Sequence, residues 1–238
     1  NKTLDFDGML AALKEVKADD AVLLHACCHN PSGMDLTKEQ WQQIAEVAKN
    51  VGFLPLIDMA YQGFGEGLEE DAYGLRLMAD SVKEMIVCSS CSKNFGLYRE
   101  RIIAQNTHSA DIANSVMLKV VRCIYSMPPA HGAAIVETIL LSDELRAQWY
   151  IELQEMRDRI NSNRTLLVDK IAAAGVTRDF SFIARQKGMF SFLGLTPEQV
   201  QQLQDEYSIY MVGSSRMSIA GIAQSNVDYL AQSIAKVL

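Results

Sequence analysis

The sequence predicts an α/β fold in the first half of the chain and a smaller α+β unit in the second half. In the first half, short apolar β-prone segments alternate with amphipathic helical segments, which is typical of a parallel sheet flanked by helices. In the second half, a long helical pattern precedes strand-like segments and further helices. The chain has 238 residues, of which 49% are hydrophobic, so it can form one large domain or two modest ones.

The first half contains three expected strands. Residues 20–27 form a buried strand that ends at His-Asn-Pro-Ser-Gly, a strong turn signal. Thr37 and Gln40 have the spacing of a capping box and open a helix that ends at Gly52. Residues 53–57 form the next strand, followed by a helix around 72–79 and a short strand at 85–88, which we also expect to be buried.

The second half begins with a long helix, expected at 142–174 and closed by Gly175. Two strands at 180–183 and 189–192 are expected to form an antiparallel hairpin. Thr196 and Pro197 open another helix, and a strand at 209–212 and a helix from 225 complete the chain. We place the domain boundary inside the long helix, with residues 1–155 in the larger domain and 156–238 in the smaller one.

The composition excludes several classes of partner. The chain has 22 basic and 29 acidic residues, a net charge of −7, which argues against binding to nucleic acid or to an anionic membrane surface. No apolar stretch approaches the length that crosses a bilayer, and the chain does not start with a signal-like region. We therefore expect neither a nucleic-acid nor a membrane partner.

The five cysteines are odd in number and mostly lie in apolar segments, which is typical of reduced thiols in a cytoplasmic protein. A zinc site needs cysteine and histidine ligands at characteristic spacings. Cys88 and Cys91, together with the adjacent Cys27 and Cys28, do not provide that spacing. No metal site is expected.

Residues 89–101 carry the strongest chemical signal. After the strand at 85–88 come the hydroxyls of Ser90 and Ser92, then Lys93, and Arg101 eight positions later. Hydroxyls and a guanidinium around one point favour a phosphate site, in which the lysine is either a phosphate contact or an amine nucleophile. An ordinary polar loop is the alternative. Asn30 and Asp58 also follow expected strands, which favours a ligand site at this edge of the sheet.

Five motifs, in order along the chain, closely resemble the aspartate and aromatic amino acid aminotransferases, which are class I aminotransferases and fold-type I pyridoxal-phosphate enzymes. The motifs are His-Asn-Pro-Ser-Gly at 29–33, Asp-Met-Ala-Tyr-Gln-Gly-Phe at 58–64, Ser-Cys-Ser-Lys-Asn-Phe-Gly-Leu-Tyr-Arg-Glu-Arg at 90–101, Tyr-Ser-Met-Pro-Pro-Ala-His-Gly at 125–132 and Ser-Arg-Met-Ser-Ile-Ala-Gly at 215–221. The family has a substantial segment before the position of His25, so the resemblance implies that the N-terminal part of the large cofactor-binding domain is lacking.

The resemblance implies catalytic roles for three residues. Lys93 would hold pyridoxal 5'-phosphate as a Schiff base and later move the substrate proton. Asp58 would keep the pyridine nitrogen protonated, which makes the ring a better electron sink. Tyr61 and Asn30 would hydrogen-bond the phenolic oxygen of the cofactor. His25 either supports Asp58 from behind or is a satisfied core histidine.

The resemblance also implies the binding residues. Ser90, Ser92 and Arg101 would hold the phosphate. Arg216 would bind the substrate α-carboxylate, and Asn30 would also contact the substrate. Arg122 would bind the distal carboxylate of a dicarboxylic substrate in the neighbouring subunit, which implies a homodimer with shared active sites. Ser215 stands where the family has glycine, a departure that matters if the backbone there needs a positive φ.

The resemblance implies transamination between an amino acid, aspartate or glutamate above all, and a 2-oxo acid. Two alternatives stay open. One is an aromatic amino acid aminotransferase, because the same scaffold accepts both substrate classes. The other is a catalytically incomplete fragment or homologue that folds or dimerises without turnover.

Overall fold

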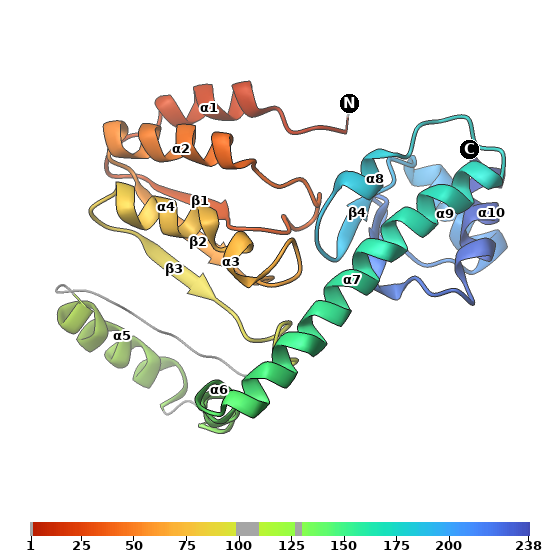
Figure 1. Cartoon of the computed structure of the whole chain (residues 1–238). Coiled ribbons are helices and arrows are strands. Elements are labelled where there is room, and N and C mark those ends of the chain that lie inside the picture. Colours follow the sequence, from red (N-terminus) through yellow and green to blue (C-terminus); the bar gives the residue numbers. More distant parts are fainter. Residues whose placement is uncertain (1, 99–109, 127–129) are drawn as a thin grey trace.

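The computed structural model of the protein describes residues 2–98, 110–126 and 130–238. Its first half contains a parallel three-stranded sheet in the order β1 (Ala21–His25), β2 (Leu54–Met59) and β3 (Ile86–Ser89). In the register of this sheet, Asp58 on β2 lies between His25 on β1 and Cys88 on β3. The predicted parallel sheet, which Figure 1 shows with its flanking helices, is confirmed.

Four helices accompany this sheet: α1 (Phe6–Lys14), α2 (Lys38–Val51), α3 (Leu68–Asp71) and α4 (Tyr73–Ser81). Helix α2 begins at the predicted capping box of Thr37 and Gln40 and ends at Gly52, whose φ of 85° only glycine adopts readily. It packs closely on α4, because a Cβ added at Gly74 would lie 2.2 Å from the ring of Trp41. The two helices therefore form one layer beside the sheet.

The strands are less buried than the sequence predicts. In β1 only Leu24 is buried and Leu23 is 58% exposed, while every residue of β3 is exposed. Strand β3 is at the edge of the sheet and pairs only with β2 within the described part of the chain. The apolar composition identified these segments as strands, but the prediction that they are buried is wrong here.

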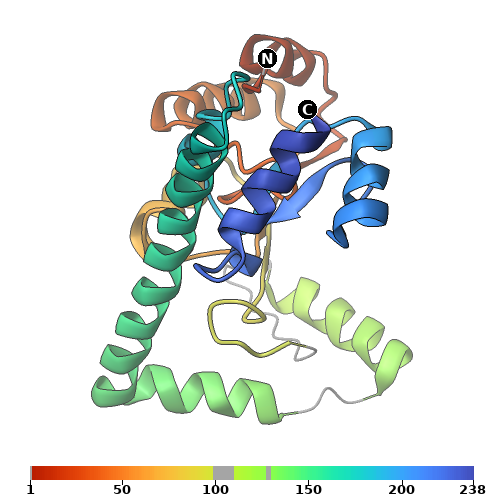
Figure 2. The ribbon, with the colours of Figure 1, turned by 90° about the vertical axis from the view of Figure 1, so that its right-hand side faces the viewer.

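Three helices connect the two halves: α5 (Ala110–Tyr125), α6 (His131–Leu141) and α7 (Asp143–Ala173). Helix α7 runs diagonally from α6 to the C-terminal unit, whereas α5 lies apart from the sheet in both views (Figures 1 and 2). The predicted stop at Gly175 is confirmed by its φ of 85°. The proposed domain boundary falls within α7, and the exact division stays a prediction.

The C-terminal unit contains α8 (Phe182–Arg185), β4 (Phe190–Phe192), α9 (Pro197–Tyr207), β5 (Arg216–Ser218), a 3-10 turn (Ile219–Gly221) and α10 (Val227–Val237). Strands β4 and β5 pair antiparallel, with Phe192 opposite Arg216. The predicted hairpin is wrong, because its first strand is helix α8 and the partner of β4 is β5. The strand predicted at 209–212 is also absent from this described region.

The predicted helices of this unit are confirmed, including the capping box at Thr196 with proline at the first position of α9. Helices α9 and α10 bury Leu203 and Ile234 completely, and Leu167 of α7 is equally buried. The C-terminal unit thus packs around fully buried apolar side chains, to which α7 contributes, and these belong to the same cluster of buried residues as those of the first half. Among the described residues, no helix is long and apolar enough to cross a membrane.

Candidate active site

Lys93 lies just beyond the carboxyl end of β3, in the loop where the sequence predicts an anion site. Its Nζ atom is 4.4 Å from the centroid of the Tyr61 ring, which follows β2. Asp58, near the end of β2, is close enough for its charge to affect the Tyr61 phenol. The carboxyl ends of neighbouring parallel strands thus bring the lysine, the tyrosine and the carboxylate together.

Asn30 links this group to the C-terminal unit. Its side chain is near enough to the phenol of Tyr61 to lower the pKa of that phenol, and Arg216 Nη1 donates to Asn30 Oδ1 at 3.5 Å. The guanidinium of Arg216 also lies over the ring of Phe190, 4.9 Å from its centroid. Two residues 186 positions apart in the sequence therefore meet at one point of the fold.

The pKa of Tyr61 is raised, chiefly because the side chain is desolvated. The nearby Tyr98, Asp58 and Cys28 raise the pKa further, and the hydrogen bond from Asn30 opposes them. Tyr61 is 6% exposed, so its phenol keeps its proton at neutral pH and can donate a hydrogen bond to an anion.

The loop before Lys93 presents two hydroxyls side by side. Ser90 Oγ donates to Ser92 Oγ at 2.9 Å, and the backbone N–H of Ser92 donates back to Ser90 Oγ at 3.2 Å. The loop closes beyond Lys93 at Gly96, whose φ is 66°. The predicted hydroxyl pair next to the lysine is therefore present at the end of β3.

The structure places two of the three remaining predicted site residues, His25 and Arg122, but does not describe Arg101. His25 pairs in register with Asp58, and its ring lies 4.7 Å from that of His29. Arg101 lies outside the described residues. Arg122 is exposed on the last turn of α5, a helix that lies apart from the sheet in both views (Figures 1 and 2).

Sequence reasoning missed two residues that support the site. Asp35 accepts hydrogen bonds from the backbone N–H groups of Cys28 and His29, at 2.6 and 2.7 Å, and so holds the turn that carries Asn30. Burial raises the pKa of Asp35, although the two N–H donors oppose this rise. Trp149 Nε1 donates to the carbonyl oxygen of Asn94 at 2.6 Å. Neither residue belongs to a motif, so only the fold reveals these contacts.

The side chains of Cys27, Cys28 and Asp71 place one potential metal-ligand atom each within 4.8 Å of one another. The Asp71 carboxylate already accepts three backbone N–H groups, from Gly63, Gly65 and Glu66, at 2.8 to 3.0 Å. These contacts shape the loop after Tyr61 and account for the buried carboxylate without a metal ion.

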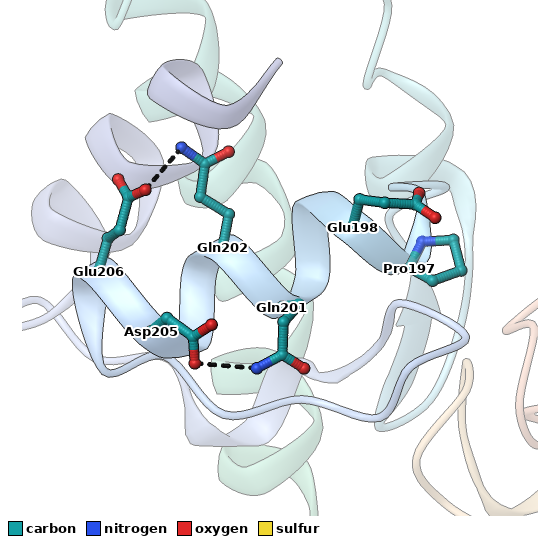
Figure 3. Close-up of a pocket in the computed structure, with 6 residues that line it drawn as sticks. All are labelled: Pro197, Glu198, Gln201, Gln202, Asp205 and Glu206. Atoms are coloured by element: carbon teal, nitrogen blue, oxygen red, sulfur yellow. Dashed lines mark hydrogen bonds between the residues drawn. The ribbon is translucent and has the colours of Figure 1, made fainter.

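A shallow hollow on the surface of α9 has a different character (Figure 3). Gln201 donates to Asp205 at 2.8 Å and Gln202 to Glu206 at 3.1 Å, as expected for residues four apart on a solvated helix. The hollow is lined by Pro197, Glu198, Gln201, Gln202, Asp205 and Glu206. None of these six residues is a lysine or an aromatic residue, and none is buried, so the hollow lacks the groups that the predicted site combines.

Comparison with known proteins agrees with this geometry. The family model for class I and II aminotransferases matches residues 1–234. The chain belongs to this family. It is 51% identical to the aspartate aminotransferase of Escherichia coli strain K12 and 47% identical to the aromatic-amino-acid aminotransferase of Pseudomonas aeruginosa. These alignments cover 100% and 98% of the chain, but only 61% and 60% of the two relatives.

Solved aminotransferases share the fold. The aromatic-amino-acid aminotransferase of Burkholderia pseudomallei, covalently bound to pyridoxal phosphate, superimposes with a TM-score of 0.95 at 48% identity. The match covers 100% of this chain and 61% of that structure. The chain therefore spans about three fifths of the length of the aminotransferases that it matches, over a region that includes every predicted site residue.

Proposed function

We propose that the protein is a pyridoxal-phosphate-dependent aminotransferase that moves an amino group between an amino acid, chiefly aspartate or glutamate, and a 2-oxo acid. The observation that carries this proposal is the meeting of Lys93, Tyr61, Asn30 and Arg216 beside Asp58 at the end of the sheet. The aspartate and aromatic aminotransferases among its relatives support the same reaction.

The residues fit the polar groups of pyridoxal phosphate. No described residue forms a salt bridge with Lys93, so its amine is available to react with the aldehyde of the cofactor. No described residue donates a hydrogen bond to the Asp58 carboxylate, so this carboxylate is available to bind the ring nitrogen. The adjacent hydroxyls of Ser90 and Ser92 suit a phosphate. When bound, pyridoxal phosphate supplies an electron sink for the electrons of the substrate Cα–H bond.

Each residue has a role that follows from its chemistry. The Lys93 amine would take the proton from the substrate Cα and deliver it to the cofactor carbon that carries the amino group. Asp58 holds a proton on the ring nitrogen, with His25 behind it, and Tyr61 and Asn30 hydrogen-bond the phenolic oxygen. Arg216 binds the α-carboxylate through two parallel N–H donors, which fixes the orientation of the Cα–H bond.

Three further assignments belong to the same proposal. Arg101 holds the phosphate together with the two serines. Arg122, exposed on α5, binds the distal carboxylate in a second subunit, which makes the enzyme a homodimer with shared sites. The mostly buried or strand-associated cysteines, all unpaired, support a cytoplasmic location.

A second candidate substrate class is aromatic amino acids. The relative from Pseudomonas aeruginosa and the structure from Burkholderia pseudomallei both carry that name, at 47% and 48% identity. Turnover of aspartate compared with phenylalanine, each with 2-oxoglutarate, decides between the two classes. The alternative of a chain that folds without turnover predicts that neither amino acid reacts.

The decisive variant is Lys93→Ala. It removes the amine that we propose moves the Cα proton, a role that alanine cannot fill. We expect aspartate turnover to fall by a factor of at least about 10². Lys38→Ala is the matched control, since Lys38 also lies over a tyrosine, 5.3 Å from the centroid of Tyr73, but on α2 away from the site. Equal activity of the two variants would refute the proposal.

A further inference from the structure

Arg164 is a buried arginine that donates only to backbone carbonyls. It lies on α7 and is 1% exposed. Nη1 donates to the carbonyl of Ile183 at 3.0 Å, and Nη2 lies 2.7 Å from the carbonyls of both Gly188 and Phe190 and 3.1 Å from that of Lys187. The Arg164 side chain on α7 thus contacts four backbone carbonyls between Ile183 and Phe190, in the segment that leads into β4.

The charge of this guanidinium is costly to bury. Desolvation lowers the pKa of Arg164 to about 10, with the nearby Cys28 and Asp35 opposing the shift, so the group is still protonated at neutral pH. Among the described residues no carboxylate forms a salt bridge with it, and its Nε has no hydrogen-bond partner. A buried cation held only by carbonyl dipoles is a costly way to stabilise a fold, which points to a positional role.

The segment held by Arg164 presses directly against the turn that carries Asn30. The backbone N–H of Lys187 donates to the carbonyl of Gly33 at 2.8 Å. A Cβ added at Gly33 would lie 2.9 Å from the carbonyl oxygens of Lys187 and Phe190, and one added at Gly188 would lie 2.4 Å from the Cβ of Cys28. The two segments therefore have no room to slide past each other.

Both segments also contact Arg216. Phe190 provides the ring under its guanidinium, and Asn30 accepts its hydrogen bond. The carbonyl of Phe190 is one of the four that Arg164 holds. A chain of direct contacts thus leads from Arg164 through the backbone of Phe190 to the face of Arg216.

We propose that Arg164 is a positioning residue that fixes Phe190 and the Asn30 turn on two sides of Arg216 and so sets the geometry of carboxylate binding. This inference rests on the proposed role of Arg216 as the carboxylate-binding arginine. Arg164 touches neither substrate nor cofactor and acts only through the backbone that it holds.

The test is the binding of succinate, a dicarboxylate without an amine, to the pyridoxal-phosphate-loaded protein by calorimetry. Arg164→Lys keeps the charge but loses the planar fork that reaches four carbonyls. We expect its dissociation constant to rise by about 10-fold, since one lost orientation contact to a charged group has about this effect. Arg178→Lys is the matched control, because Arg178 also donates to a carbonyl, that of Gly194, but on the exposed surface.

The outcomes separate this inference from the proposed function. Arg216→Ala with unchanged succinate binding would refute the carboxylate role of Arg216 itself. Lost binding in Arg216→Ala, with Arg164→Lys and Arg178→Lys both as tight as the parent, would refute only the positioning role, even if Arg164→Lys melts earlier.

Phe190→Leu decides the question where Arg164→Lys does not fold. This variant removes the ring under Arg216 and keeps the backbone carbonyl that Arg164 holds. We expect the same loss of about 10-fold in succinate affinity. Affinity equal to that of the parent would overturn the inference.

Discussion

Ser215 precedes Arg216 with a backbone φ of 61°, a conformation that favours glycine. The side chain offsets this strain, because Ser215 Oγ accepts the backbone N–H groups of Gly194 and Leu195 at 2.9 and 3.2 Å. A glycine relieves the strain but cannot accept these bonds. Serine can thus replace glycine at this left-handed position, because its hydroxyl stabilises the turn through these two hydrogen bonds. The same bonds fix the start of β5.

Replacing Ser215 with alanine should therefore lower the free energy of unfolding more than replacing it with glycine. Ser215→Ala keeps the left-handed strain and leaves two donors without an acceptor, so we expect a loss of about 2 kcal/mol in the free energy of unfolding. Ser215→Gly loses the same bonds but relieves the strain, so its loss is smaller by about 1 kcal/mol. Urea unfolding measures both, and a glycine variant as unstable as the alanine variant would contradict the account.

His29 makes the stability of the protein depend on pH. Desolvation lowers its pKa below the usual 6.5, and the neighbouring His25 adds to the effect. The unfolded chain therefore binds a proton at a higher pH than the folded one, so stability that is complete above pH 6.5 declines as the pH falls toward the folded pKa.

We expect His29→Gln to weaken this decline, measured as the change in unfolding free energy between about pH 7.5 and about pH 5.5. The parent protein, measured at the same two pH values, is the reference. A decline in His29→Gln as steep as in the parent would show that other groups cause it.

At the scale of elements, α7 connects the Lys93 loop with the C-terminal unit. Near its start, Trp149 donates to the carbonyl of Asn94 and stacks on Phe95, with ring centroids 4.3 Å apart. Fifteen residues later Arg164 holds the segment before β4. One continuous helix thus carries contacts to both sides of the candidate site.

Trp149→Phe removes the N–H donor and keeps an aromatic ring for the stack. We expect a loss of about 1 kcal/mol in stability and faster amide exchange in the peptide that contains residues 93–97. Tyr150→Phe, at the exposed neighbour on the same helix, serves as the control. Exchange that accelerates equally in both variants would mean that Trp149 does not hold this loop.

The errors of sequence prediction also lie at this scale. The alternating pattern of Phe180 and Phe182 indicates a strand, yet Phe182 and its neighbour Ile183 are both buried, which a helix turn packed on α7 allows. Strand β4 pairs with β5, more than twenty residues away, rather than with the segment next to it. Local pattern predicts the helices with caps well, and long-range pairing decides the short strands.

At the scale of the whole molecule, the sequence predicts the site better than the contacts that support it. The motifs identify Lys93, Asp58, Asn30 and Arg216, because reactive groups at strand ends have recognisable neighbours in the chain. Arg164 lacks such neighbours and gains its role only when α7 crosses the segment before β4. Residues that act through the backbone of other segments become visible only in the fold.

The proposed homodimer with shared active sites predicts complementation between two inactive variants. We expect Lys93→Ala and Arg122→Ala each to lose aspartate turnover when all subunits carry the same substitution. In a mixed dimer, one site combines Lys93 of one subunit with Arg122 of the other, so random mixing should restore about a quarter of the parental turnover. Mixing without recovery would contradict the assignment of Arg122 to the neighbouring site.

The most direct test of the central claim is to locate the lysine that binds the cofactor. The purified protein is mixed with pyridoxal phosphate, reduced with borohydride and mapped by peptide mass spectrometry, with Lys93→Ala and Lys38→Ala in parallel. We expect a visible absorption band in the parent and in Lys38→Ala, and a stable cofactor label on Lys93 in both. A label on another lysine, or a band and label that persist in Lys93→Ala, would contradict the account.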